Sequence, residues 1–384
     1  MSVISRKQID HVEKLLRRIG EARGTSQRRF LTSTYLGSFD ATMSAVAKAH
    51  SKMRPNRRPA EAKLEAIASG LDAFKGTEEP VLVHWKPKNS HPYYRAVFEF
   101  GIKHRALQQL VGGALAELLE LHPDQYLLHG GVHEAIRQTS KALSAGLQWG
   151  VELDISNCYQ SFDGNELTKL IPLPKEVTEN IILSAHLNLV PGNIWHFFGP
   201  EDDHEGDPIT LKAALSSARL GISQGSAASP LVAEAMIAIA LENIPNLGVN
   251  IAYADNVLLL AKSESDVVSM TEALLAALKA HPVGRLRPRR KVFKPGQPIR
   301  YLGHVLSPLN DLVRIDPSER KLQEFVVRAA SLIARAQKPS PSPHVRANRI
   351  EAAEEYVRSW TASFKLCNGI QKLRDQWLSK IPVA

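Results

Sequence analysis

Apolar and polar positions follow two different periods along this chain. Apolar residues recur every three or four positions in Ile9–Ile19, in Ile102–Leu121 and in Leu231–Leu241, which predicts amphipathic or buried helices. Shorter apolar runs bounded by turn residues, such as Val81–Lys88 and Tyr93–Phe100, predict strands. Because the two kinds of segment are interleaved, the pattern predicts an α/β (α+β) fold.

The run Ile251–Leu260 consists of two short apolar halves with polar residues between them, which predicts a β-hairpin. Asp255 and Asn256 are expected at its tip, because both residue types tolerate a tight turn. The hairpin would present the carboxylate of Asp255 at a rigid position. Taken alone, an aspartate in such a turn more often serves the turn than a reaction.

A second apolar strand, predicted from Trp149, ends in another carboxylate at Asp154 and then turns toward a helix. Between the two aspartates lies Gly221–Pro230, a turn of small residues that opens an apolar helix. Two carboxylates at the ends of buried strands can hold metal ions together. The pair therefore becomes a candidate catalytic site.

These segments and their order resemble the palm of reverse transcriptases. The resemblance rests on the aspartate-ended strand, on the QGxxxSP turn at Gln224–Pro230 and on the YADx hairpin at Tyr253–Asn256. Further along, Tyr301–His304 reads YLGH and is similar to the (F/Y)LGH primer-grip hairpin of the same family. The likeness covers Trp85 to Leu306.

The resemblance implies a right-hand polymerase that performs RNA-directed DNA synthesis. We expect N-terminal helices and fingers over residues 1–145, a palm with the catalytic site over 146–306 and a helical thumb over 307–384. The proline-rich stretch Lys338–Pro343 would separate two pieces of the thumb, because repeated proline favours an extended chain. The implied partners are an RNA template, the DNA product and deoxynucleoside triphosphates.

The metal site is implied by the same resemblance. Nucleotidyl transfer uses two divalent ions that stabilise the attacking and leaving oxygens. The implied ligands are Asp154 and Asp255, both also catalytic, with help from the carbonyl of Ile155. Two Mg²⁺ ions are the expected cofactor, because the ligands are hard oxygens. Asn256 stands where the family usually carries a second aspartate, so a non-catalytic RNA-binding scaffold stays open as an alternative.

Four cations are the candidates for charge compensation at the phosphates. Lys86, Lys88 and Arg95 lie on the predicted fingers hairpin, where the family neutralises the incoming triphosphate. Lys291 stands roughly where the family keeps a lysine that can protonate the leaving pyrophosphate, a general-acid role. Alternatively, Lys291 is one more cation in a phosphate-binding patch.

Three further residues are assigned to nucleotide binding by the resemblance. Tyr159 follows Asp154 by five positions and matches the aromatic gate that excludes the ribose 2′-hydroxyl. Gln224 and Gly225 match the turn that contacts the incoming nucleotide. Deoxynucleotides are therefore the expected substrates, and a core tyrosine or an ordinary helix-opening turn are the plainer alternatives.

Charge and cysteine content support this interpretation. The 384 residues include 48 Lys and Arg against 39 Asp and Glu, which suits a polyanionic partner. Basic clusters lie at Arg54–Arg58 and at Arg285–Lys294. Only Cys158 and Cys367 are present, and no apolar run approaches the length of a membrane span, so we expect a cytoplasmic protein without a membrane partner.

Within the family, the chain is most similar to the compact bacterial reverse transcriptases of abortive-infection and phage-defence systems, because no zinc module, nuclease or ribonuclease H segment is evident. A non-coding RNA, a second copy of the chain and a partner defence protein are candidate partners. A template-independent or protein-primed DNA polymerase is an alternative reading of the same motifs.

Overall fold

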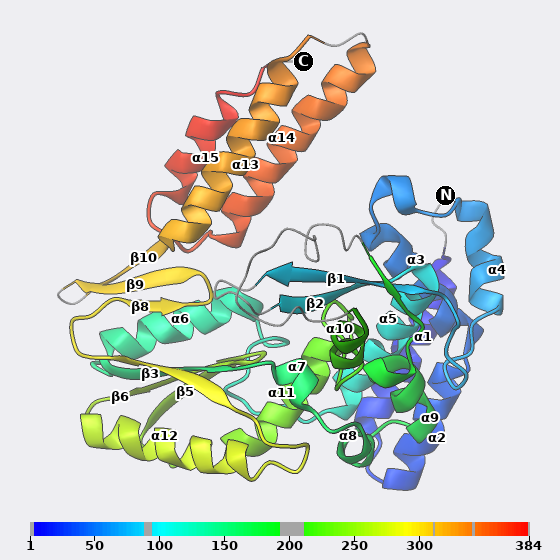
Figure 1. Ribbon diagram of the computed structural model, residues 1–384, viewed down its shortest axis with the longest axis horizontal. Helices are drawn as coiled ribbons and strands as arrows, with labels where there is room; N and C mark the ends of the chain where they lie inside the picture. The colour runs from blue at the N-terminus through cyan, green and yellow to red at the C-terminus, as the bar shows by residue number, and fades with distance from the viewer. Residues whose placement is uncertain (1–3, 88–93, 193–210, 310–311, 340–341, 383–384) are drawn as a thin grey trace. The chain divides into compact units, whose positions relative to one another are not determined.

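The computed structural model describes residues 4–87, 94–192, 211–309, 312–339 and 342–382 (Figure 1). The chain divides into two compact units between which it passes repeatedly. The first unit comprises Met1–Leu127, Ile155–Ile244 and Ala273–Arg289, and the second comprises Leu128–Asp154, Pro245–Glu272 and Arg290–Ala384. In the described part of the chain, no helix combines the length and the apolar character needed to cross a membrane.

The N-terminal part of the first unit is a group of helices packed around one central helix, α5. The carboxylate of Glu79 accepts backbone N–H bonds from Lys103 and His104, each at 3.1 Å, which satisfies donors at the start of α5. Helices α1, α2 and α3 all contact α5. The elements are α1 (Arg6–Glu21), α2 (Thr25–Leu36), α3 (Phe39–Lys52), η1 (Pro55–Arg57), η2 (Glu61–Lys63), α4 (Leu64–Ser69) and α5 (Ile102–Leu118).

A three-stranded sheet follows in the same unit, in the order β2-β1-β4. Strands β1 (Val81–Pro87) and β2 (Tyr94–Glu99) are antiparallel, as predicted, and β4 (Leu189–Pro191) runs parallel to β1. Their buried face forms one core cluster that includes Trp85 and Phe98.

Helix α11 (Ser229–Leu241) of the first unit contacts α5 and α7, begins with proline at its first turn and is buried on almost every side. This explains why its sequence is apolar without a polar stripe. The other elements are α7 (Cys158–Ser161), α8 (Gly164–Leu170), α9 (Lys175–Val177), η3 (Thr178–Ile182), η4 (Ser184–His186) and α10 (Leu211–Ala218).

The four-stranded sheet that carries both candidate aspartates has the order β5-β6-β3-β7. Helix α6 packs against β5 (Figure 1), and Met270 of α12 lies close to Gly248 at the start of β5. The elements are β3 (Trp149–Ile155), β5 (Gly248–Tyr253), β6 (Asn256–Ala261), β7 (Pro288–Phe293), α6 (Gly131–Ser144) and α12 (Glu264–Lys279).

The hairpin β5–β6 confirms the predicted strands but corrects the predicted tip. Tyr253 pairs with Asn256, so the two turn residues are Ala254 and Asp255, and Asn256 is the first residue of β6. The expectation of Asp255 and Asn256 at the tip was wrong by one position. The cause is non-local, because Asn256 also pairs across the sheet with Asp154 on β3 and is thereby drawn into the ladder.

The C-terminal part of the second unit is an antiparallel sheet in the order β10-β9-β8, followed by a three-helix bundle (Figure 1). In the bundle, the Phe325 ring stacks on Trp360 at 4.2 Å between ring centroids and meets Trp377 edge-on, so these aromatic residues pack the core. The elements are β8 (Ile299–Tyr301), β9 (His304–Leu309), β10 (Leu312–Pro317), α13 (Glu319–Gln337), α14 (Pro343–Ser363) and α15 (Ile370–Leu378).

Candidate active site

The second unit brings the two candidate aspartates together. Asp154 on β3 lies directly opposite Asn256 on β6, and Asp255 immediately precedes Asn256 in the turn. Directly opposite residues in an antiparallel pair have Cβ atoms about 4.5–5.5 Å apart. Asp154 is exposed and Asp255 is half-buried, so both carboxylates remain within reach of a ligand.

Asn256 contributes a hydrogen bond where a carboxylate would contribute charge. Its side-chain amide nitrogen Nδ2 donates to Oδ1 of Asp255 at 3.1 Å. An aspartate in the same place would put a second negative charge beside Asp255 and could not donate when ionised. The amide thus orients one oxygen of Asp255 without adding charge.

Backbone strain is concentrated in the motifs. Among the described residues other than glycine, those with positive φ are Asn157 at 54°, Ala254 at 52° and Leu302 at 46°. This conformation costs an L-residue about 1–2 kcal/mol and persists only where the surrounding structure imposes it. In the second unit, Ala254 directly precedes Asp255, and Leu302 lies within the YLGH motif.

Lys291 lies on β7 and is exposed, and it interacts electrostatically with a carboxylate that belongs to none of the family motifs. This carboxylate is Glu152, two residues before Asp154 and therefore on the same face of β3. Burial raises the pKa of Glu152, the positive charge of Lys291 lowers it, and the charge of Asp154 raises it. The two-residue spacing from Asp154 was the available sequence signal for Glu152.

In the first unit, the turn at Gln224 and Gly225 is hydrogen-bonded to β2 of the predicted fingers hairpin. The backbone N–H of Phe98 on β2 donates to the carbonyl oxygen of Gln224 at 2.9 Å. Gly225 has φ +109°, and a Cβ atom at this position would lie 2.7 Å from the Phe98 carbonyl oxygen. Only glycine permits this close approach.

Tyr159 is joined to the beginning of the same turn. Its carbonyl oxygen accepts a hydrogen bond from the backbone N–H of Ile222 at 2.8 Å. Gly221 has φ +60°, and an added Cβ atom would lie only 2.0 Å from that oxygen. The first unit therefore brings Tyr159, Gln224 and Gly225 into one connected backbone arrangement with β2.

Two of the three predicted fingers cations can be located. Lys86 and Arg95 are paired in register across β1 and β2, and both side chains are exposed. Residues paired in this way lie on the same face of the sheet. Lys88 lies outside the described residues.

The two basic clusters differ in their surroundings. In the first cluster, Arg57 forms an ion pair with Glu99, and Arg58 donates to the carbonyl oxygens of Ser51 and Met53, both at 2.8 Å. These two exposed arginines therefore stabilise local structure, and the role of the cluster at a polyanion stays a prediction.

The second cluster remains open to solvent. All six of its cations are exposed, and β7, which carries three of them, is an edge strand. Residues 273–310 contain eight of the 48 Lys and Arg and none of the 39 Asp and Glu, so the other residues carry 40 against 39. Nearly all the net positive charge of the protein therefore lies in this one segment.

The donor set at the two aspartates fits magnesium. No group of three or more His, Cys, Asp and Glu side chains suited to a metal occurs among the described residues. However, protein-bound Mg²⁺ commonly has one or two carboxylate ligands and completes its shell with water and substrate phosphates. Asp154 supplies one such carboxylate from β3, and Asp255 supplies the other from the turn just before its strand partner Asn256.

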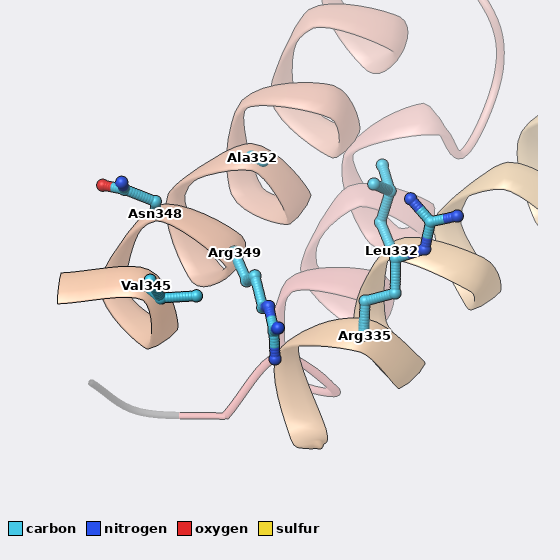
Figure 2. Close-up of a pocket in the computed structure, with 6 residues that line it drawn as sticks. All are labelled: Leu332, Arg335, Val345, Asn348, Arg349 and Ala352. Carbon is cyan, nitrogen blue, oxygen red and sulfur yellow. The ribbon is translucent and has the colours of Figure 1, made fainter. Parts of the chain in front are cut away.

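A separate hollow lies between helices α13 and α14 of the bundle (Figure 2). It has a volume of about 260 Å³ and combines apolar walls with two arginines. None of the predicted site residues contributes to it. Its lining residues are Leu332, Arg335, Val345, Asn348, Arg349 and Ala352.

The strand-end aspartate, the glycine turn, the second aspartate in a hairpin and the YLGH turn occur in the order expected of RNA-directed polymerases. In agreement, the sequence profile of the family described as reverse transcriptase (RNA-dependent DNA polymerase) matches residues 86–306, more than half of the chain. The chain belongs to the reverse transcriptase family, and the family implies the polymerase fold. A search of curated proteins found no match to the chain.

Proposed function

We propose that this protein is an active RNA-directed DNA polymerase that transfers deoxynucleotides to a 3′-hydroxyl with the help of two Mg²⁺ ions. The observation that carries the proposal is the pairing of Asp154 with Asn256. Because Asp255 directly precedes Asn256 in the chain, this pairing brings Asp255 close to Asp154. Asp154, Asp255 and the carbonyl of Ile155 would hold the ions. When bound, the ions would supply positive charge to the attacking and leaving oxygens.

The remaining site residues have roles in binding and protonation. Lys86, Lys88 and Arg95 compensate the charge of the triphosphate, a role supported by the exposure of Lys86 and Arg95 on one face of the hairpin. Lys291 donates a proton to the leaving pyrophosphate. The location of Lys291 beside the carboxylate-bearing strand β3 supports this role.

Tyr159, Gln224 and Gly225 select the nucleotide. The ring of Tyr159 excludes a ribose 2′-hydroxyl, and the turn at Gln224 and Gly225 contacts the nucleotide. The backbone hydrogen bonds that connect this turn to β2 and to Tyr159 support a common role, because they hold the three residues in fixed relation.

We also propose the division into fingers over residues 1–145, palm over 146–306 and thumb over 307–384, and a role in bacterial antiphage defence in the cytoplasm. Two buried, unbridged cysteines suit the proposed reducing compartment, the cytoplasm. A non-coding RNA, a second copy of the chain or a defence protein would be the partner.

A non-catalytic RNA-binding scaffold is the second candidate function, favoured by Asn256 in place of a second aspartate.

The deciding experiment incubates the purified protein with Mg²⁺ and all four deoxynucleoside triphosphates, then sequences both the bound RNA and the new DNA. We expect DNA complementary to the bound RNA. DNA that matches no bound RNA would favour template-independent or protein-primed synthesis. RNA binding with no DNA product would favour the scaffold.

The basic edge strand should contribute to RNA binding through phosphate contacts. We expect replacement of Arg289, Arg290 and Lys294 by glutamine to weaken binding of a 20-base-pair RNA hairpin. The slope of log K against log salt concentration should decrease in magnitude by about 2–3, because each lost phosphate contact releases about one counterion fewer. Fluorescence anisotropy at several KCl concentrations measures this slope. Lys291 is left unchanged because of its proposed chemical role.

The matched control removes the same charge from helix α1, where Lys14, Arg17 and Arg18 are exposed. Glutamine at these three positions should leave the salt slope within experimental error of the wild type. An equal decrease in both triple variants would mean that net charge, and not the β7 strand, determines RNA binding.

A further inference from the structure

The hydroxyl group of Tyr301 contacts the backbone of the hairpin that carries Asp255. Tyr301 is only 1% exposed and is among the largest fully buried side chains. Its oxygen Oη donates to the carbonyl oxygen of Ile251 on β5 at 2.8 Å and lies 3.4 Å from that of Asn256 on β6. One phenol therefore contacts both strands of the hairpin.

The contacted carbonyls lie on the two sides of the Asp255 turn. Ile251 precedes the two turn residues by three positions, and Asn256 follows Asp255 directly. The Asn256 side chain also donates to the Asp255 carboxylate at 3.1 Å. A shift of the Asn256 backbone would therefore move both the turn and the group that orients Asp255.

The turn that follows Tyr301 has a strained backbone. Tyr301 pairs with His304, and the turn residues Leu302 and Gly303 have φ of 46° and 81°. Positive φ at both positions is typical of a type I′ turn, which disfavours leucine at its first position. His304 Nδ1 lies 3.0 Å from the Leu302 carbonyl oxygen, and this contact stabilises the strained turn.

We propose that Tyr301 is a positioning residue whose hydroxyl sets the location of the Asp255 turn relative to strand β8. The inference rests on the proposed role of Asp255. The role belongs to the hydroxyl, because the aromatic ring alone cannot donate a hydrogen bond to the Ile251 carbonyl. Without the hydroxyl, the ring still fills its place, but the Ile251 carbonyl loses its Tyr301 donor and the hairpin gains freedom to move.

The test is Tyr301→Phe, which removes one oxygen atom and keeps the ring. We expect unchanged helical content by circular dichroism and about tenfold faster hydrogen exchange of the backbone amides in residues 248–261. The rate constant for single-nucleotide incorporation should fall about tenfold with the nucleotide KM within about twofold of wild type, because the displaced carboxylate acts in the chemical step.

The matched control is Tyr35→Phe, which removes the hydroxyl of another buried tyrosine, 3% exposed, on α2 of the first unit. This variant should leave both hairpin exchange and incorporation unchanged. A Tyr301→Phe variant with wild-type exchange would overturn the proposal, as would faster exchange with an unchanged incorporation rate. An equal effect of Tyr35→Phe would also overturn it, since the cause would then be general loss of stability.

The proposal can fail separately from the proposed polymerase activity. If the wild-type protein incorporates no nucleotide, the polymerase proposal fails, and Mn²⁺ binding measured by electron paramagnetic resonance replaces the rate as a readout. About tenfold weaker Mn²⁺ binding by Tyr301→Phe, together with faster hairpin exchange, would support the positioning role. Unchanged Mn²⁺ affinity would contradict it.

Discussion

Asp255→Ala is expected to abolish nucleotide incorporation, and Asp154→Ala should do the same. In the proposed site, loss of either carboxylate removes a ligand from ions that would contribute several kcal/mol of transition-state stabilisation, so the rate should fall at least about 10³-fold. Asp154 is exposed and Asp255 half-buried, and substitutions at such positions usually change the free energy of unfolding by no more than about 0.5–1 kcal/mol. Primer extension and thermal unfolding measure the two quantities.

Two comparisons sharpen this prediction. Asp255→Asn keeps the shape of the side chain but removes its charge, so it should lose as much activity as the alanine variant. Asp10→Ala, at an exposed carboxylate on α1, should retain full activity. Normal DNA synthesis by either Asp154→Ala or Asp255→Ala would remove both residues from the proposed site.

Gly221→Ala is expected to destabilise the folded state strongly, although it adds only one methyl group. The added methyl group would lie 2.0 Å from the carbonyl oxygen of Tyr159, and neither backbone segment can rotate away as a flexible side chain would. Positive φ for alanine and local overpacking together should lower the free energy of unfolding by about 2–5 kcal/mol. Chemical denaturation monitored by circular dichroism measures this loss.

Gly146→Ala separates the cost of positive φ from the cost of overpacking. Gly146 also has positive φ, at +85°, but an added Cβ atom would meet nothing within 4 Å. This variant should lose only the backbone term of about 1–2 kcal/mol. Equal destabilisation by both variants would show that the close approach of Gly221 to Tyr159 has no energetic consequence.

Local patterns in the sequence were sufficient to locate several of the helices and strands. The prediction of strands at Val81–Lys88 and Tyr93–Phe100 agrees with β1 and β2, and the helix expected over Leu231–Leu241 is α11, Ser229–Leu241. These segments are predictable because hydrophobic periodicity depends on neighbours within a few positions. The family motifs belong to the same class of information, because each motif is a short contiguous stretch.

Pairing between distant segments decided the details of the site. The turn of the Asp255 hairpin lies one residue earlier than expected, because Asn256 is held in the ladder by Asp154, about a hundred positions away in sequence. Likewise, the ion pair of Arg57 joins it to Glu99 on β2, 42 positions further along the chain. No local pattern contains either partner.

The sequence by itself therefore determined the residue types, their order and the family, including the two aspartates, the QG turn and the YLGH motif. Only the tertiary structure decided which of these residues interact: Phe98 bonds to Gln224, the charge of Lys291 acts on Glu152, and the Tyr301 hydroxyl bonds to the backbone of the Asp255 hairpin. The physical reason is that sheet register and buried hydrogen bonds join segments far apart in sequence, and these long-range contacts form only when the chain is folded.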